Sequence, residues 1–394
     1  MADRDTDSIF PRRRFLPICC AEPFRIFFPA GAVLGVIGVS LWPLFYLGAG
    51  VAYPNIAHAR LMIEGLMGSF IFGFLGTAGP RLTGAPHFSL SEVGTIFTFD
   101  LLAGGFHVSG ANQLGDICFV VCLVVFALAL AKRFRQRKDS LPPNFVLVGL
   151  GLVSAIAGTV LIAAGETAQY SRAYQFGSAL LNQSWVLLQV IGVAPFFIRR
   201  LLDLPTPDLP ESRALAPQWK REAALAALIG VVIIVSFWID VIGLPRTGGW
   251  IRAGAIGFCV LTQIPFRGRT FLANSLRGGI MSIFFGFVGV ALVPLYRIGL
   301  LHIVFITGFN LVAFTVASRV VFGHSGNLPL LRKRLGFFIA TITLLVLAML
   351  SRVSADFVPR VRTAHLIGAA ICWLLAAAIW MSKVIPKVAV VERE

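Results

Sequence analysis

The distribution of positive charge along this chain constrains its fold more than any other feature. The sequence contains about a dozen apolar segments of helix length, and about 17 residues are enough to cross a hydrocarbon core of about 30 Å. Most of the 34 Lys and Arg residues lie in alternate loops between these segments. Because short loops rich in Lys and Arg stay on the cytoplasmic side of a membrane, both termini are expected there. The sequence therefore predicts an all-α, polytopic protein of the cell inner (cytoplasmic) membrane.

The number of predicted spans decides on which side of the membrane each basic residue falls. The basic residues assigned to the outer side are Arg60, Arg172, Arg246, Arg252, Arg297, Arg352, Arg360 and Arg362. A wrong number of spans would scramble the alternation of charge, so the pattern favours twelve. These spans are 24–48, 56–79, 91–109, 112–132, 144–164, 173–198, 222–240, 249–266, 275–294, 299–322, 335–351 and 363–382.

The composition excludes an ordinary soluble domain, because 57% of the residues are hydrophobic and only 13% are charged. A net charge of +16 also occurs in nucleic-acid-binding proteins. Here the charges lie in short loops rather than on one recognition element, so we expect the lipid bilayer as partner and no nucleic acid. Residues 1–15 are polar and basic and precede a full-length apolar stretch, so we expect no cleavable signal peptide.

The longest predicted loop, residues 199–221, contains four prolines and separates two sets of six spans. Proline removes backbone donors and stiffens extended chain, which is typical of a linker. The expected order is a cytoplasmic tail, a six-helix half, a cytoplasmic linker, a second six-helix half and a cytoplasmic tail. Their boundaries are 1–23, 24–198, 199–221, 222–383 and 384–394.

Two spans show a faint internal likeness. Each opens near a histidine, His58 or His302, and each is followed by a turn containing glycine, Gly84 or Gly326. An internal repeat would produce this pattern, and so would two helices of similar length with glycine at their C-termini.

The topology places four histidines near the outer membrane face: His58, His107, His302 and His365. Neutral imidazole is the usual ligand of haem iron and copper, and facing pairs of histidines hold such cofactors in helix bundles. Met62, one turn after His58, offers a thioether that suits copper. The alternative interpretation is that these are ordinary residues at the level of the lipid headgroups.

Charged residues near or within the predicted spans need a partner or a function, because burying a charge in lipid is costly. Guanidinium groups have the fork geometry that binds carboxylates, including haem propionates, and five arginines lie at the outer level: Arg60, Arg297, Arg352, Arg360 and Arg362. Lipid headgroups, Glu64 and Glu166 are the alternative partners. Asp100 is a candidate for a proton or ion path, or for pairing with a neighbouring helix. Nucleotide-binding and hydrolase motifs are absent from the sequence.

Two long motifs connect the chain with a known family. They are IAHARLMIEGLMGSFIFGFLGTAGPRLTGAP at 56–86 and HIVFITGFNLVAFTVASRVVFGHSGNLPL at 302–330, together with EPFRIFF at 22–28. In order and spacing they resemble the NnrS family of multi-span membrane proteins, with its GFLLTA-P-x-x-TG and R-x-x-x-GH-[ST]-G elements. The chain departs from the W-H-x-H-E run common in that family, because Ala57, Arg60 and Leu61 replace the tryptophan, the second histidine and the acid.

The resemblance implies a twelve-helix protein that carries haem b, with copper as a further candidate, and that is tied to nitric oxide metabolism and resistance to nitrosative stress. By motif position it assigns His58 and His302 as metal ligands, and Arg319 and His324 to an inner-side motif. His107 and His365 lie outside these motifs, and either is a candidate to replace the missing second histidine.

Two other functions remain open at this point. Twelve helices in two halves are also typical of a solute or ion transporter without a cofactor, and a membrane oxidoreductase is the further alternative.

His302 and His324 lie too far apart to bind the same metal ion, because 22 residues, about 33 Å of helix, separate them. We therefore expect His324 to serve a separate site, with an anionic partner or as a cap at the negative end of its helix.

Overall fold

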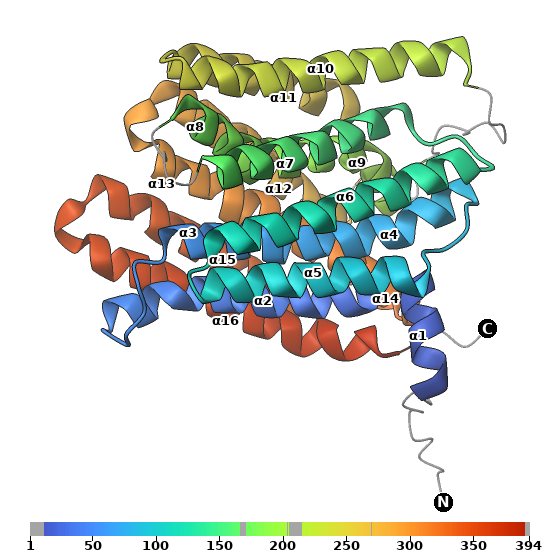
Figure 1. The fold of residues 1–394 in the computed structure, drawn as a ribbon, viewed down its shortest axis with the longest axis horizontal. Coiled ribbons are helices and arrows are strands. Elements are labelled where there is room, and N and C mark those ends of the chain that lie inside the picture. Colours follow the sequence, from blue (N-terminus) through green and yellow to red (C-terminus); the bar gives the residue numbers. More distant parts are fainter. Residues whose placement is uncertain (1–11, 166–170, 203, 205–214, 269, 391–394) are drawn as a thin grey trace, which may run out of the picture.

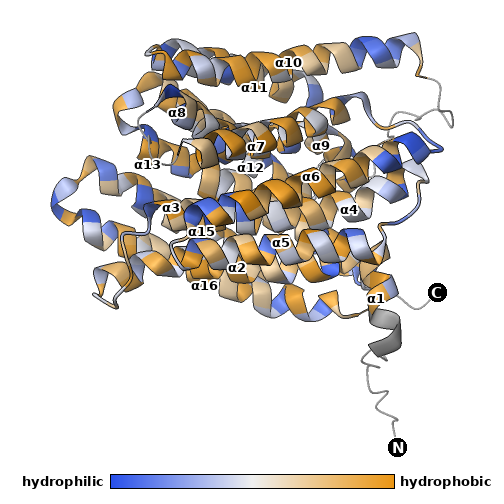
Figure 2. Cartoon of the chain, viewed as in Figure 1, coloured by the Kyte–Doolittle hydropathy of each residue, from blue (hydrophilic) through white to orange (hydrophobic). Residues whose placement is uncertain are grey.

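A computed structural model describes residues 12–165, 171–202, 204, 215–268 and 270–390 of the chain. All regular secondary structure within these ranges is helical, and most of the helices run side by side in one bundle (Figure 1). Hydrophilic residues gather towards the two ends of the helices, and apolar residues fill the middle (Figure 2). Many leucines and valines on the outside are exposed, as expected where lipid rather than water covers the surface.

The helices follow the predicted spans closely. In the first half they are α1 (Arg12–Ala21), α2 (Phe24–Tyr46), α3 (Asn55–Arg60), η1 (Leu61–Gly68), α4 (Ser69–Thr83), α5 (Leu90–Val108), α6 (Asn112–Gln136), η2 (Pro143–Phe145), α7 (Val146–Ala164), α8 (Arg172–Ala179), η4 (Leu180–Trp185) and α9 (Val186–Leu201). In the second half they are α10 (Pro217–Val241), α11 (Pro245–Gln263), α12 (Phe271–Leu292), η5 (Pro294–Tyr296), α13 (Arg297–His302), η6 (Ile303–Asn310), α14 (Leu311–His324), η7 (Leu328–Arg332), α15 (Gly336–Phe357), η8 (Pro359–Val361) and α16 (Arg362–Val388).

Ten helices in the described part of the chain are long and apolar enough to cross a membrane, so the protein is a multi-pass membrane protein. The helices α5 and α11 are not among the ten, and twelve crossings therefore remain a prediction. The contacts of α5 support it: Glu92 near its start binds Arg133 near the end of α6, and His107 near its end approaches Asp116 near the start of α6. Thus α5 runs antiparallel to α6 over most of the length of that helix.

Three of the long helices change from α to π geometry along their length. The π segment η1 begins three residues after His58, and η6 begins directly after His302. The third, η4, lies between α8 and α9. Short π segments are rare and occur frequently at functional sites. The likeness between the two His-led spans thus extends from sequence to backbone geometry.

Helices from both predicted halves meet in the core. The ring of Trp380 in α16 stacks on Phe314 in α14 with centroids 4.6 Å apart, and lies 5.9 Å from the ring of Phe70 in α4. The helix α16 also lies along α2 (Figure 1). The linker of 199–221 falls partly outside the described residues, as does Glu166, so the division into halves stays a prediction.

A glycine on α2 allows a close approach of two helices beside His58. A Cβ on Gly38 would lie only 2.8 Å from Cβ of Leu61, so only glycine lets the backbone of α2 approach η1 this closely. The close approach brings the carbonyl of Gly38 to the side chain of His58, which begins the site described next.

Candidate functional site

His58 and His302 come from different halves of the chain and are brought together at one end of the bundle. His58 donates from Nδ1 to the carbonyl of Gly38 at 2.9 Å, and His302 donates from Nδ1 to the carbonyl of Ile298 at 2.7 Å. Because a carbonyl only accepts, both protons are fixed on Nδ1 and both Nε2 atoms keep their lone pairs. The two side chains are close enough to interact electrostatically. A histidine that ligates a metal typically has this arrangement.

Arg352 of α15 accompanies this pair. It interacts electrostatically with His58 and with His302, and it forms an ion pair of 3.2 Å with Asp356. The sequence already places Arg352 at the outer level, as one of five arginines that are candidates for a haem propionate or a lipid headgroup. The preceding residue, Ser351, is hydrogen-bonded to the carbonyl of His365 at 2.8 Å and lies 3.2 Å from its Nδ1. His365 is therefore adjacent to the site through α15.

Met62 lies against the same turn of α2 as His58. A Cβ on Gly38 would lie 3.6 Å from Sδ of Met62, and the carbonyl of Gly38 accepts the proton of His58. A thioether and an imidazole are thus both placed around one glycine. This donor set suits haem iron or copper better than a hard cation such as magnesium.

Arg60 has a different surrounding from the one expected for a propionate-binding residue. Its Nε lies 2.7 Å from Oδ1 of Asp116 and 3.2 Å from Oε1 of Glu64, and its side chain is only 4% exposed. Of the alternatives weighed from the sequence, Glu64 is one of the actual partners. The second partner, Asp116, was missed, although its place in the first turns of α6 puts it at the same level as His107.

Arg60 belongs to a buried polar cluster that joins three helices. Nε2 of His107 lies 3.0 Å from Oε2 of Glu64 and 3.9 Å from Oδ1 of Asp116, and Nδ1 of His107 lies 3.2 Å from Oδ1 of Asn112. Potential ligand atoms of Glu64, His107 and Asp116 all lie within 4.8 Å of one another. This group could hold a metal ion, although Arg60 already balances part of its negative charge.

A glycine makes room for the histidine of this cluster. A Cβ on Gly115 would lie 2.5 Å from Cε1 of His107, which is closer than real carbon atoms approach. The imidazole therefore packs directly on the backbone of α6. Asp100 lies on the same helix as His107, and its Oδ2 accepts a hydrogen bond of 2.5 Å from Ser69. A row of buried polar groups thus continues from the cluster into the bundle.

Arg297, the remaining outer candidate, is exposed at the start of α13. It lines a cavity of about 510 Å³ together with Tyr296, Asp356 and Arg362. Asp356 is also the partner of Arg352, so this carboxylate connects the cavity that Arg297 lines with the arginine that accompanies the histidine pair. This placement keeps Arg297 near the site.

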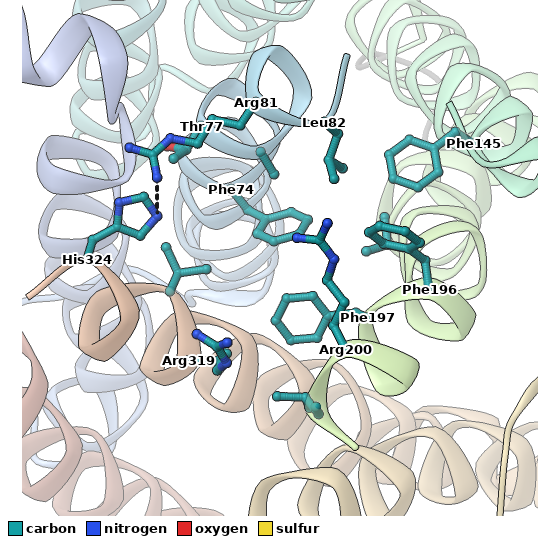
Figure 3. Close-up of a pocket in the computed structure, with 14 residues that line it drawn as sticks. Phe74, Thr77, Arg81, Leu82, Phe145, Phe196, Phe197, Arg200, Arg319 and His324 are labelled. Atoms are coloured by element: carbon teal, nitrogen blue, oxygen red, sulfur yellow. Dashed lines mark hydrogen bonds between the residues drawn. The ribbon is translucent and has the colours of Figure 1, made fainter. Parts of the chain in front are cut away.

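His324 lies at the opposite end of the same long helix from His302. Its Nδ1 donates to Oε1 of Glu22 at 2.8 Å, and its Nε2 accepts from Arg81 at 3.1 Å (Figure 3). Glu22 also binds Arg81 at 2.5 Å and Arg25 at 2.5 Å. Burial is the largest influence on Glu22 and opposes ionisation. The hydrogen bond from His324 and the charge and hydrogen bond of Arg25 outweigh it and lower the pKa of Glu22 to about 2.

Arg319 lies about one turn before His324, and both residues line a cavity of about 190 Å³ at this end of the bundle (Figure 3).

Comparison with known protein families identifies the family of this chain. The profile of the family described as NnrS protein matches residues 18–389. The chain belongs to the NnrS family. The match covers α2 to α16, so both motif-bearing helices of this NnrS-family protein lie within it. A comparison with curated proteins gave no match.

Proposed function

We propose that this NnrS-family protein binds haem b near the outer membrane face, with copper as a second candidate metal. We further propose that it acts in nitric oxide metabolism or in resistance to nitrosative stress. The pair of His58 and His302 carries the proposal, because both imidazoles lie together with their Nε2 lone pairs available. The resemblance of the surrounding motifs to the NnrS family, which is associated with haem and copper, gives the second support.

The residues at this end of the bundle fit such a cofactor in their chemistry. Two neutral imidazoles suit haem iron, and the thioether of Met62 adds a soft donor for copper. Arg352 offers a cation to a propionate, and Arg297 and His365 remain further candidates at the same end. When bound, haem iron supplies a site that binds nitric oxide and exchanges electrons. The carbonyls of Gly38 and Ile298 orient the imidazoles.

The spectrum of the purified protein tests this proposal. We expect a Soret band and a pyridine haemochrome of haem b from haem-replete cells, and a large loss of both in His58→Ala and His302→Ala. His87→Ala is the matched control, because His87 lies in the loop between α4 and α5, at the opposite end of the bundle. A colourless preparation of folded protein, or equal loss in the His87 variant, contradicts the proposal.

The group of Glu64, His107 and Asp116 is the second candidate location for copper. Elemental analysis of single variants separates the two locations. Loss of copper in Met62→Leu with retention in His107→Gln assigns copper to the histidine pair, and the reverse result assigns it to the buried cluster. Retention in both variants contradicts copper at either location.

The orientation of the protein is part of the proposal. We propose both termini on the cytoplasmic side of the inner membrane, which puts His58 and His302 at the outer face and His324 at the inner face. Labelling of single-cysteine variants from outside checks this orientation. Cysteines at 172 and 297 should react with an impermeant reagent, and a cytoplasmic label at either position contradicts the topology.

A further inference from the structure

A small apolar cavity lies inside the bundle, where helices of the two predicted halves meet. Its volume is about 90 Å³. Met67 of η1 and Phe309 of η6 both line it, so each of the two π segments that follow His58 and His302 forms part of its wall. The remaining walls come from α2, α4, α9, α12 and α14. The proposed haem site does not use this cavity.

The lining of this cavity has almost no polar groups. Of the described residues that form it, none is charged and only Gln189 has a polar side chain. The amide nitrogen of Gln189 donates to the carbonyl of Val148 at 3.1 Å, and its oxygen has no hydrogen-bond partner among the described residues. A buried water typically makes about three hydrogen bonds, and this amide alone cannot supply them. An ion would lose its hydration without compensation. The cavity therefore favours an uncharged, apolar occupant.

The volume of the cavity limits the size of that occupant. An apolar cavity of about 150 Å³ in a protein core stays dry and binds benzene or xenon. A space of about 90 Å³ suits xenon or a diatomic molecule better than an aromatic ring. Diatomic gases such as nitric oxide and dioxygen are uncharged and dissolve in hydrocarbon more readily than in water, so the bilayer itself supplies them.

The cavity is not sealed from the outside of the bundle. Ile71 on α4, Val190 on α9 and Ala313 on α14 line it and are only partly buried. The rings of Phe74 and Phe197, which also line it, meet edge to face with centroids 5.8 Å apart (Figure 3). Partly exposed side chains change rotamer on a timescale of picoseconds to nanoseconds, which is enough to admit a small gas molecule. Molecules dissolved in the bilayer can therefore reach the cavity.

We propose that this cavity holds a small uncharged gas molecule, and that nitric oxide passes through it on the way to the site of His58 and His302. Met67 lies nine residues after His58, and Phe309 lies seven residues after His302. At 1.5 Å per residue, these intervals correspond to about 10–14 Å of helix. The identity of the gas rests on the proposed function, whereas the existence of the gas site rests on the size and lining of the cavity.

Xenon binding to the purified full-length protein tests the gas site and needs no cofactor. Binding is followed by xenon NMR in one fixed detergent, with protein-free micelles as the blank. We expect saturable binding in the parent protein and at least about tenfold weaker binding in Ala313→Leu, because the added isopropyl group takes up most of the space. Absence of saturable binding in the parent, or unchanged affinity in a folded Ala313→Leu variant, overturns the proposal.

A second alanine provides the matched control. Ala127 of α6 is partly buried like Ala313 but lies outside the lining of the cavity. Ala127→Leu should therefore change xenon affinity less than about twofold, and equal weakening by this variant overturns the proposal. Val316→Ile adds a single methyl group to the lining and should weaken xenon binding by an intermediate amount. An unchanged affinity in Val316→Ile overturns the proposal if Ala313→Leu does not fold.

The rate at which nitric oxide binds to the haem-containing protein tests passage through the cavity. After flash photolysis, the bimolecular association rate constant should fall about threefold or more in Ala313→Leu and stay near that of the parent in Ala127→Leu. The Soret band should be the same in both variants, because neither alanine belongs to the proposed haem site. An unchanged rate in Ala313→Leu, together with weakened xenon binding, overturns passage through the cavity. A protein without haem contradicts the proposed function and with it the passage, whereas xenon binding still decides the gas site.

Discussion

Removing the cation of the buried cluster should be the most damaging single change at the end of the bundle that carries His58. In Arg60→Met, the carboxylates of Glu64 and Asp116 would remain near each other without their shared partner. Both side chains are 2% exposed, and Nε of Arg60 lies 3.2 Å from Glu64 and 2.7 Å from Asp116. Removing one partner of a buried ion pair costs about 3–5 kcal/mol, because it leaves an uncompensated charge. We expect a loss of stability in that range.

The assay is reversible denaturation of the purified protein in one fixed detergent, followed by tryptophan fluorescence. Arg172→Met is the matched control, because Arg172 is an exposed arginine at the start of α8. Its replacement should change the free energy of unfolding by less than about 0.5 kcal/mol. A metal-free preparation of each variant excludes an indirect effect through bound cofactor.

Neutralising Glu64 and Asp116, the two carboxylates that Arg60→Met leaves without their arginine, provides the decisive comparison. The triple variant Arg60→Met, Glu64→Gln, Asp116→Asn carries no uncompensated acid, so most of the lost stability should return. If Arg60→Met is as stable as the Arg172 control, or if the triple variant is less stable than the single one, burial of an unpaired charge does not govern this cluster.

Three further predictions follow from individual contacts. Gly115→Ala should destabilise the protein by about 1–3 kcal/mol, because its Cβ would lie 2.5 Å from His107; a thermally unchanged variant would show that the imidazole moves freely. Glu22→Gln should remove stability at neutral pH and leave little difference near pH 2. The pKa of Glu22, about 2, lies below its unfolded value near 4.3, so its contribution is present above pH 4 and is lost as the pH falls towards 2; parallel pH profiles would contradict this. His324→Ala should leave the haem absorbance near that of the parent protein; selective loss of haem from a folded variant would refute separate sites at the two ends.

Local sequence patterns predicted the helices well, because hydropathy acts within one segment. All twelve predicted segments are helical in the described residues, although ten meet the criteria for crossing a membrane. The two exceptions, α5 and α11, contain charged residues such as Asp100 and Arg252 that lower their hydropathy. Arg252 is buried and binds Asp240 of α10 at 2.5 Å. Its partner is on another helix, so one segment read alone cannot show that the charge is compensated.

Contacts between distant segments were predictable only where the predicted topology put two residues of the same kind at the same depth in the membrane. The proximity of His58 and His302 follows from such reasoning, since the predicted topology begins both spans at the same face. The pairing of Arg60 with Asp116 does not, because it depends on which faces of α3 and α6 turn towards each other. The π segments η1 and η6 were not foreseen either, since no periodicity of apolar residues distinguishes them from α-helix at this length.

The helix that runs through α13, η6 and α14 carries both polar ends of the molecule, yet the two ends are held by different forces. At one end, backbone carbonyls orient His58 and His302, and such bonds contain no ionised partner. At the opposite end, His324 is held by Glu22 and Arg81, and Arg81 is 46% exposed. Exposed ion pairs weaken with salt, whereas bonds between neutral groups do not. The pair of His58 and His302 is therefore suited to a fixed ligand geometry, and the end with His324 to contacts that respond to the ions around it.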